Sequence, residues 1–162
     1  MQLTLYADYS LRTLMYLGVK RETATVGEIA EQYGISRNHL VKVVHHLGKL
    51  GYIHTSRGKS GGITLAGEPE AINVGEVIRR VEPNFYIVEC FNESANGCPI
   101  TPACLLRGMM FEAYEAFFGV LDKYTLSDLL ENSEALRGLL ENGAAVESRP
   151  IADISRTQRD SI

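Results

Sequence analysis

"TVGEIAEQYGISRNHLVKVVHHLGKLGYIHTSRGKSGGITL", residues 25–65, predicts two helices joined by a tight turn. Thr25 and Glu28 have the spacing of a capping box, and a glycine ends the helical pattern that follows them. Ser36 is expected to cap a second helix over about 36–50, in which apolar residues recur at helical spacing. A short helix, a tight turn and a second helix form a helix-turn-helix.

The residues that follow the second helix predict a β-hairpin. Residues 52–65 contain two short strand patterns around a turn rich in Gly, Ser and Lys, with Arg57 and Lys59 near its tip. A basic hairpin directly after the second helix is the wing of a winged helix-turn-helix domain. The expected fold class is therefore mainly α with a small β-hairpin wing, completed by a long dimerisation helix.

The start of the second helix contains residue types that read DNA. N-terminal side chains of a recognition helix contact base edges, and side chains of a wing contact phosphate or the minor groove. Arg37 suits guanine and Asn38 suits adenine. The alternative is a solvated helix start, which we consider weaker inside a helix-turn-helix. The predicted DNA-binding residues are Ser36, Arg37, Asn38, His39, Lys42, Arg57, Lys59, Ser60, Gly61 and Gly62.

Charge is distributed unevenly along the chain. Residues 1–65 contain eight Lys and Arg against four Asp and Glu, and residues 66–162 contain eight against sixteen, so the two parts carry +4 and −8 and sum to −4. A basic module on an acidic body suits a nucleic-acid binder whose other part has a different role. Charge alone leaves open the alternative of chance surface charge.

The N-terminal segment and the motifs that are missing restrict the class of protein. "MQLTLYADYSLRTLMYLGVKR" has no basic start, and Asp8 and Arg12 interrupt its apolar positions, so it does not read as a signal peptide. No apolar run approaches the roughly 20 residues that span a bilayer. We expect a cytoplasmic protein without a membrane partner, in which thiols stay reduced. A C-x-x-C motif, a phosphate-binding loop and a Ser-His-acid arrangement are all missing, which favours a regulator over an enzyme.

The chain divides into a DNA-binding domain, a cysteine segment and a helical end. We expect the winged helix-turn-helix over 1–83, a cluster-binding loop over 84–104, and a dimerisation helix with a short helical ending over 101–141. The long helix, with an apolar stripe, is expected over 101–124 and capped by Thr101, which would place Cys104 at its third position. The stripe could instead pack on its own domain. Residues 142–162 are polar and are expected to form a mobile tail.

All cysteines of the chain lie within "CFNESANGCPITPAC", residues 90–104. Seven residues separate the first two and five separate the last two, which resembles neither the close pairs of zinc sites nor the repeats of bacterial ferredoxins. A helix start near Cys104 would favour its thiolate. The pattern leaves open an iron–sulfur cluster, a zinc site, or redox-active thiols. A fourth metal ligand would be an acid, a histidine, solvent or a residue of another chain.

Three segments together resemble a known family. "MQLTLYADYSLRTLMYL", "GISRNHLVKVVHHLGKLGYIHTSRGKSGGI" and "CPITPAC" are similar to the iron–sulfur winged-helix regulators, among them nitric-oxide-sensitive repressors, over residues 1–141. The resemblance implies a homodimer that represses transcription by binding double-stranded operator DNA. It also implies an iron–sulfur cluster as cofactor, with 4Fe-4S favoured and 2Fe-2S possible, and nitric oxide as the signal that releases the DNA.

The resemblance also implies the ligands of the cluster. Cys90, Cys98 and Cys104 match the ligating cysteines of the family, and Asp8 matches an acidic residue that completes the cluster from the partner subunit. The alternative function is a winged-helix regulator that depends on zinc or on cysteine oxidation.

Overall fold

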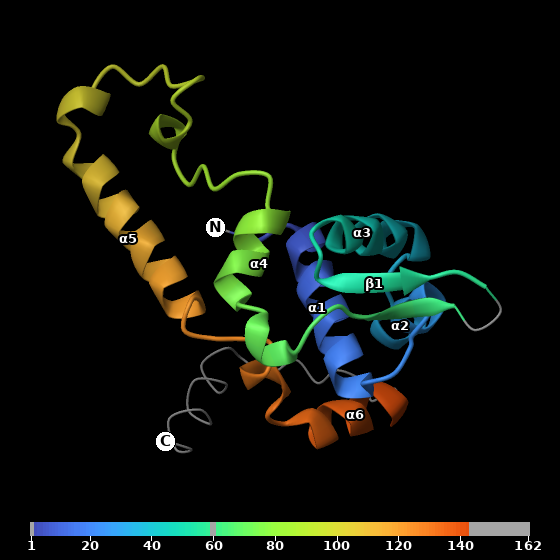
Figure 1. Ribbon diagram of the computed structural model, residues 1–162. Helices are drawn as coiled ribbons and strands as arrows, with labels where there is room; N and C mark the ends of the chain where they lie inside the picture. Colours follow the sequence, from blue (N-terminus) through green and yellow to red (C-terminus); the bar gives the residue numbers. More distant parts are fainter. Residues whose placement is uncertain (1, 59–60, 143–162) are drawn as a thin grey trace.

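The structure is a computed structural model that describes residues 2–58 and 61–142 (Figure 1). It confirms the expected fold class, a mainly helical chain with a two-stranded antiparallel wing. The helices are α1 (Leu5–Lys20), α2 (Val26–Tyr33), α3 (Arg37–Lys49), α4 (Val74–Val81), α5 (Leu105–Leu121) and α6 (Ser133–Asn142), and the strands are β1 (Ile53–Ser56) and β2 (Gly62–Leu65). Short 3-10 turns lie at Pro69–Ala71, Glu89–Phe91, Thr101–Ala103 and Asp128–Leu130.

Local hydrogen bonds set the limits of α2. The Thr25 hydroxyl accepts the backbone N–H of Glu28, and the Glu28 carboxylate accepts the backbone N–H of Thr25, so the predicted capping box is present. Gly34 ends the helix in the left-handed conformation, with φ of 62°. Ser36 precedes α3 as predicted, but its side chain makes no capping hydrogen bond; its carbonyl accepts the N–H groups of His39 and Leu40 instead.

Apolar faces of α1, α2 and α3 meet in one core. Leu14 and Leu17 of α1 and Ile29 of α2 are almost fully buried there. The helical spacing of α3 puts Leu40, Val43 and Leu47 on the same buried face. Complete burial of one such aliphatic side chain contributes about 1.5–3 kcal/mol, so this face fixes how α3 lies on α1 and α2.

The wing is bonded to the segment before α2 as well as to itself. Strand β1 pairs with β2 in the register Ile53↔Leu65 to Ser56↔Gly62, and Ile63 also exchanges two backbone hydrogen bonds with Ala24, at 2.7 and 2.9 Å. A Cβ atom on Gly62 would lie 2.6 Å from the Ala24 carbonyl oxygen, so the close backbone approach requires glycine. Lys59 and Ser60 lie outside the described residues.

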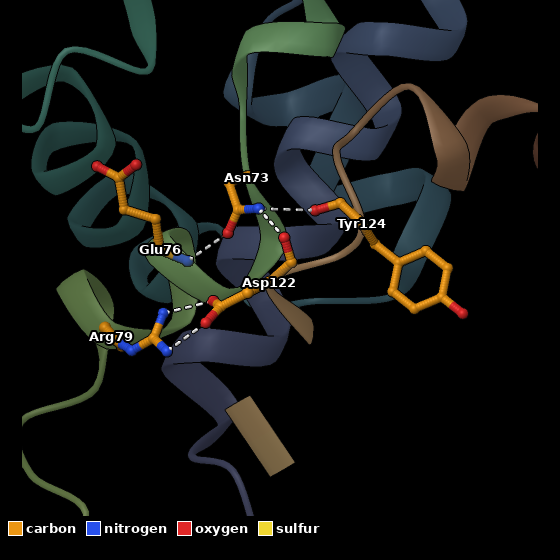
Figure 2. A network of polar contacts seen from close by, with 5 residues as sticks. All are labelled: Asn73, Glu76, Arg79, Asp122 and Tyr124. Carbon is orange, nitrogen blue, oxygen red and sulfur yellow. Dashed lines mark hydrogen bonds and ion pairs between the residues drawn. The ribbon is translucent and has the colours of Figure 1, made fainter. Parts of the chain in front are cut away.

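A polar network fastens the C-terminal end of α5 to both ends of α4 (Figure 2). Arg79 donates two hydrogen bonds to the Asp122 carboxylate, at 2.6 and 2.7 Å, and the side-chain amide of Asn73 donates to the carbonyls of Asp122 and Tyr124. The Arg79 guanidinium also lies 4.1 Å from the centre of the Phe118 ring. We call Asn73, Arg79 and Asp122 the α4–α5 clamp.

The long helix begins later than its sequence suggests. Thr101–Ala103 form a 3-10 turn, α5 starts at Leu105, and Cys104 is its N-cap, so the predictions that Thr101 caps the helix and that Cys104 is its third residue are wrong. The reason is that the Thr101 hydroxyl donates back to the carbonyl of Cys98, at 2.8 Å, and so serves the preceding turn.

Most apolar residues of α5 are not buried in the described chain. Phe118 is buried against α4, whereas Leu106, Met109 and Val120 are more than half exposed. Figure 1 shows α5 leaning away from the core, with the cysteine loop at its outer end. Within residues 2–58 and 61–142 no helix combines the length and apolar character needed to cross a membrane. The predicted tail, beyond residue 142, lies outside the described residues.

A carboxylate in α2 gives a pH-dependent contribution to stability. The Lys20 ammonium donates to Glu28 at 2.6 Å, and this bond, together with the N–H of Thr25, lowers the pKa of the Glu28 carboxyl. A lowered folded-state pKa stabilises the protein above the ordinary pKa of glutamate, and the contribution disappears as pH falls through the lowered value.

Glu28→Gln should therefore decrease the free energy of unfolding at neutral pH by no more than about 1 kcal/mol, because the pair is partly exposed and glutamine retains the capping box. Urea unfolding of variant and parent over a pH series measures this difference, which should shrink toward acidic pH. Glu31→Gln, which changes an exposed carboxylate of the same helix, is the control. A loss of equal size at every pH would contradict the role given to the charge.

Candidate nucleic-acid interface and cysteine loop

The predicted DNA-reading residues of α3 gather at one exposed helix end. Ser36, Arg37, Asn38, His39 and Lys42 are all exposed, while the opposite side of α3 is in the core. A helix that is buried on one side and polar at its exposed N-terminal end suits insertion into the major groove.

The end of β1 and the start of β2, which lead into the wing turn, lie on the same side of the molecule as the start of α3 (Figure 1). Arg57 is exposed next to Gly58, whose φ of 114° only glycine adopts readily. Gly61 and Gly62 are half-buried and are needed by the hairpin itself, since a Cβ atom on Gly61 would lie 2.5 Å from the carbonyl oxygen of Ser56.

One further exposed residue of α3 was not among the predicted DNA-binding residues. Val41 lies beside Lys42 on α3 and its side chain is 50% exposed, although it is apolar. An exposed aliphatic group on a recognition helix suits contact with a thymine methyl group. The signal in the sequence is that Val41 falls outside the helical spacing of Leu40, Val43 and Leu47.

The recognition helix is also contacted from behind by α1. The Tyr6 hydroxyl donates to the carbonyl oxygen of Lys42 at 3.1 Å, and the rings of Tyr6 and His46 lie 5.7 Å apart. His46 is half-buried in this contact, whereas the adjacent His45 is exposed.

Hydrogen bonds between residues of the cysteine loop surround Cys98. The side-chain oxygen of Asn96 accepts the N–H of Cys98 at 3.1 Å, and the Cys98 carbonyl accepts the Thr101 hydroxyl. The Glu89 carboxylate accepts the N–H of Gly97 at 2.7 Å, which ties the turn containing Cys90 to the turn containing Cys98. The 84–104 segment thus holds its cysteines on a short series of linked turns.

The three thiols suit a soft metal centre in their chemistry. Cys90, Cys98 and Cys104 are free and half-buried, and thiolates are the ligands of iron–sulfur clusters. Cys104 precedes the N-terminus of α5, where the helix dipole stabilises negative charge. Over the described part of the chain, no group of three His, Cys, Asp or Glu residues is close enough to hold a metal ion. The donors therefore fit a cluster by type, and a bound cluster would require the loop to close around it.

An aromatic cavity of about 680 Å³ lies against the cysteine loop. Its lining includes Phe91, Phe111 and Tyr114, together with Cys104 and Arg107. Phe111 and Tyr114 belong to α5, and the rings of Phe91 and Tyr114 meet edge to face with their centres 6.4 Å apart. The cavity therefore places aromatic side chains and the charged groups of Glu93 and Arg107 along the same hollow as Cys104.

Asp8 lies on α1 and is not grouped with the cysteines. Its carboxylate forms an ion pair with Arg12, with distances of 2.8 and 3.1 Å, and 38% of its side chain is exposed. The Arg12 guanidinium also faces the ring of Tyr33 at 5.8 Å. Asp8 is thus accessible to another molecule, although any new ligand would compete with Arg12.

The whole winged domain and the cysteine loop match a family of regulators. The model of the Rrf2 family, described as iron-dependent transcriptional regulators, matches residues 3–132. The chain belongs to the Rrf2 family. Its relatives include the HTH-type transcriptional regulator NsrR of Shouchella clausii, 52% identical over 143 residues that cover 87% of this chain and 96% of the relative. NsrR of Bacillus subtilis is 51% identical and covers 87% and 98% in the same terms.

A solved Rrf2-like structure agrees with the fold. CymR, titled the global cysteine regulator of B. subtilis, superposes with a TM-score of 0.64 at 27% identity, covering 80% of this chain and 95% of CymR. The family match and the NsrR relatives confirm the resemblance seen in the sequence. They also confirm that this Rrf2 protein is a transcriptional regulator and not an enzyme.

Proposed function

We propose that this Rrf2 protein is a cytoplasmic repressor that binds double-stranded operator DNA as a homodimer and senses nitric oxide through an iron–sulfur cluster in each subunit. The observation that carries the proposal is the presence, in one chain, of an exposed DNA-reading helix end and three free thiols on a loop that leads into α5. Relatives named NsrR and the iron-dependent family description support it.

In this proposal α3 contacts the DNA bases, and the wing makes further contacts with the DNA. Arg37, Asn38 and His39 are the residues proposed to meet base edges, while Ser36 and Lys42 meet phosphate or the groove wall. The second group of proposed contacts is in the wing and comprises Arg57, Lys59, Ser60, Gly61 and Gly62. Binding of this kind weakens steeply with salt, because Lys and Arg release counterions from the phosphates.

The cluster would be held by Cys90, Cys98 and Cys104, with Asp8 of the partner subunit completing the set. A 4Fe-4S cluster is favoured, and a 2Fe-2S cluster is the alternative. When bound, the cluster supplies iron that reacts with nitric oxide. Cys104 is the N-cap of α5 and its side chain makes no capping hydrogen bond, so a bond between its sulfur and the cluster would tie the start of the helix to the loop.

The exposed apolar side chains of α5 support the proposed homodimer. Leu105 is 80% exposed, Leu106 is 60% exposed and Met109 is 62% exposed. Large apolar side chains grouped in this way on one helix are typical of an interaction surface. Pairing through α5 would hold two recognition helices at the separation of two DNA half-sites, near one helical turn. In this proposal residues 1–83 read DNA, 84–104 hold the cluster and 101–141 form the dimer.

The decisive test is spectroscopic. Protein purified without oxygen should be coloured, contain iron and acid-labile sulfide in equal amounts, and bind operator DNA. Nitric oxide should change the visible spectrum and release the DNA at the same stoichiometry. A colourless protein with stoichiometric zinc, or one whose DNA affinity follows reversible disulfide formation, would replace the cluster by the zinc or redox alternative. Spectral change without release of DNA would overturn the proposed signal.

Asp8→Ala tests the ligand proposed to come from the partner subunit. The variant should still assemble a cluster on its cysteines, but it should lose iron faster and show altered nitric-oxide kinetics, because one iron loses its protein oxygen ligand. Stopped-flow absorbance measures both rates. Arg12→Ala is the matched control, since it breaks the same ion pair and leaves the carboxylate in place. Equal behaviour of the two variants would remove Asp8 from the site.

A further inference from the structure

The start of α1 is bonded to the residue that leads into the cysteine loop. Glu82 directly follows α4, two residues before the loop begins. Its carboxylate accepts both the backbone N–H of Thr4, at 2.7 Å, and the Thr4 hydroxyl, at 3.0 Å. Thr4 is the N-cap of α1, and its hydroxyl also accepts the N–H of Ala7. A displacement of Glu82, at the entrance of the loop, would therefore move or break the hydrogen bonds that hold the first turn of α1.

The same turn of α1 touches the recognition helix through Tyr6. Its hydroxyl donates to the carbonyl oxygen of Lys42, and its ring packs near the ring of His46. Lys42 and His46 are one helical turn apart, so the two contacts lie on the same side of α3. Lys42 is also one of the proposed DNA-binding residues, which places the contact behind the DNA-reading end of the helix.

The Thr4–Glu82 contact and the Tyr6–Lys42 contact belong to one continuous helical turn. Thr4, Tyr6 and Asp8 belong to one turn, in which the N–H of Asp8 bonds to the Thr4 carbonyl. Ala7 within it is fully buried, and the Ser10 hydroxyl donates to the Tyr6 carbonyl at 2.8 Å. The first turn of α1 therefore moves as a unit. Asp8 is two residues beyond Tyr6, about 200° around the helix, so one side of the turn contacts α3 and the other presents Asp8.

We propose that Tyr6 is a positioning residue that connects the cysteine loop to the recognition helix through its hydrogen bond to the Lys42 carbonyl and its ring contact with His46. The inference rests on the proposed function, because it explains how the state of the loop reaches α3. A hydrogen bond at 3.1 Å is lost when its atoms separate by a further ~0.5 Å. A small displacement of the α1 turn thus removes a restraint from α3 next to Lys42.

The test compares operator affinity with and without the cluster. Tyr6→Phe removes the hydroxyl and retains the ring, and Tyr16→Phe is the matched control on the same helix, where the ring packs against Tyr33 instead of α3. The dissociation constant of cluster-free protein divided by that of cluster-loaded protein gives a ratio for each variant. Tyr6→Phe should reduce this ratio by about threefold to tenfold, by weakening the loaded form, because one hydrogen bond contributes that much. Tyr16→Phe should retain the parent ratio.

A second readout and a second variant separate the possible outcomes. Hydrogen exchange at the α3 amides should accelerate in loaded Tyr6→Phe protein and not in Tyr16→Phe. Glu82→Ala, which removes the acceptor at the other end of the connection, should reduce the ratio in the same direction, and it carries the test alone if Tyr6→Phe does not fold. A parent ratio of one would overturn the proposed function itself. A large parent ratio that survives in Tyr6→Phe and in Glu82→Ala would overturn only the role of Tyr6.

Discussion

Cys104→Ala protein purified without oxygen is expected to contain no iron–sulfur cluster and to bind operator DNA only as well as cluster-free parent protein. The thiol of Cys104 is the donor that lies at the N-cap of α5 and against the aromatic cavity. The substitution leaves a methyl group where the thiol-bearing side chain stood and so removes one of the three proposed sulfur ligands. Iron and sulfide analysis, visible absorption and operator titration measure the loss together, and Cys98→Ala should give the same result.

The control for the cysteine variants lies in the same loop. Ser94→Ala removes a hydroxyl that donates to Asn92 and leaves all three thiols in place, so it should retain the parent iron content. Full colour together with full operator affinity in Cys98→Ala or Cys104→Ala would rule out the proposed ligand set. Loss of colour with undiminished operator affinity would separate the cluster from DNA binding.

Arg37→Ala is expected to weaken specific operator binding by about 1–3 kcal/mol, or roughly 5-fold to 150-fold. Arg37 is the first residue of α3, it is exposed, and a guanidinium there can donate two hydrogen bonds to a guanine edge. Its loss should relax discrimination at one base pair while changing non-specific binding much less. Titration of operator and scrambled duplexes at two salt concentrations separates these effects.

Arg156→Ala removes the same charge from the C-terminal segment and serves as the control for Arg37→Ala. It should leave discrimination between operator and scrambled duplex unchanged. Equal weakening by the two substitutions would mean that charge alone accounts for the effect, and that α3 does not read bases.

The winged domain was predictable because its signals are local. The capping box of Thr25 and Glu28 and the left-handed Gly34 fix α2 within its own sequence, and the apolar spacing from Leu40 to Leu47 fixes the buried side of α3. The wing followed from its turn composition. The reason for Gly62 was not visible in the sequence, because its close neighbour, the Ala24 carbonyl, lies nearly forty residues earlier in the chain.

Predictions failed where a residue had two possible partners. Thr101 followed by proline suits a helix N-cap, but its hydroxyl bonds to the Cys98 carbonyl and closes a 3-10 turn, so α5 starts four residues later. The apolar stripe of α5 did not single out Phe118, whose burial depends on α4 and on the guanidinium of Arg79. Similarly, the sequence pointed to Asp8 but not to its ion pair with Arg12, one turn further along α1.

The α4–α5 clamp has a mechanical consequence for the proposed dimer. The clamp secures the C-terminal end of α5, and the cysteine loop lies at the opposite end, so α5 is a lever arm about 25 Å long with its fulcrum at Asp122. A displacement of about 1 Å at the outer end corresponds to a rotation of about 2° at the fulcrum. If two such arms are joined in a dimer, the rotation turns each DNA-binding domain against the other. The strength of the ion pair between Arg79 and Asp122 would then determine how strongly α5 resists this rotation, and so how closely the two recognition helices keep the spacing of the half-sites.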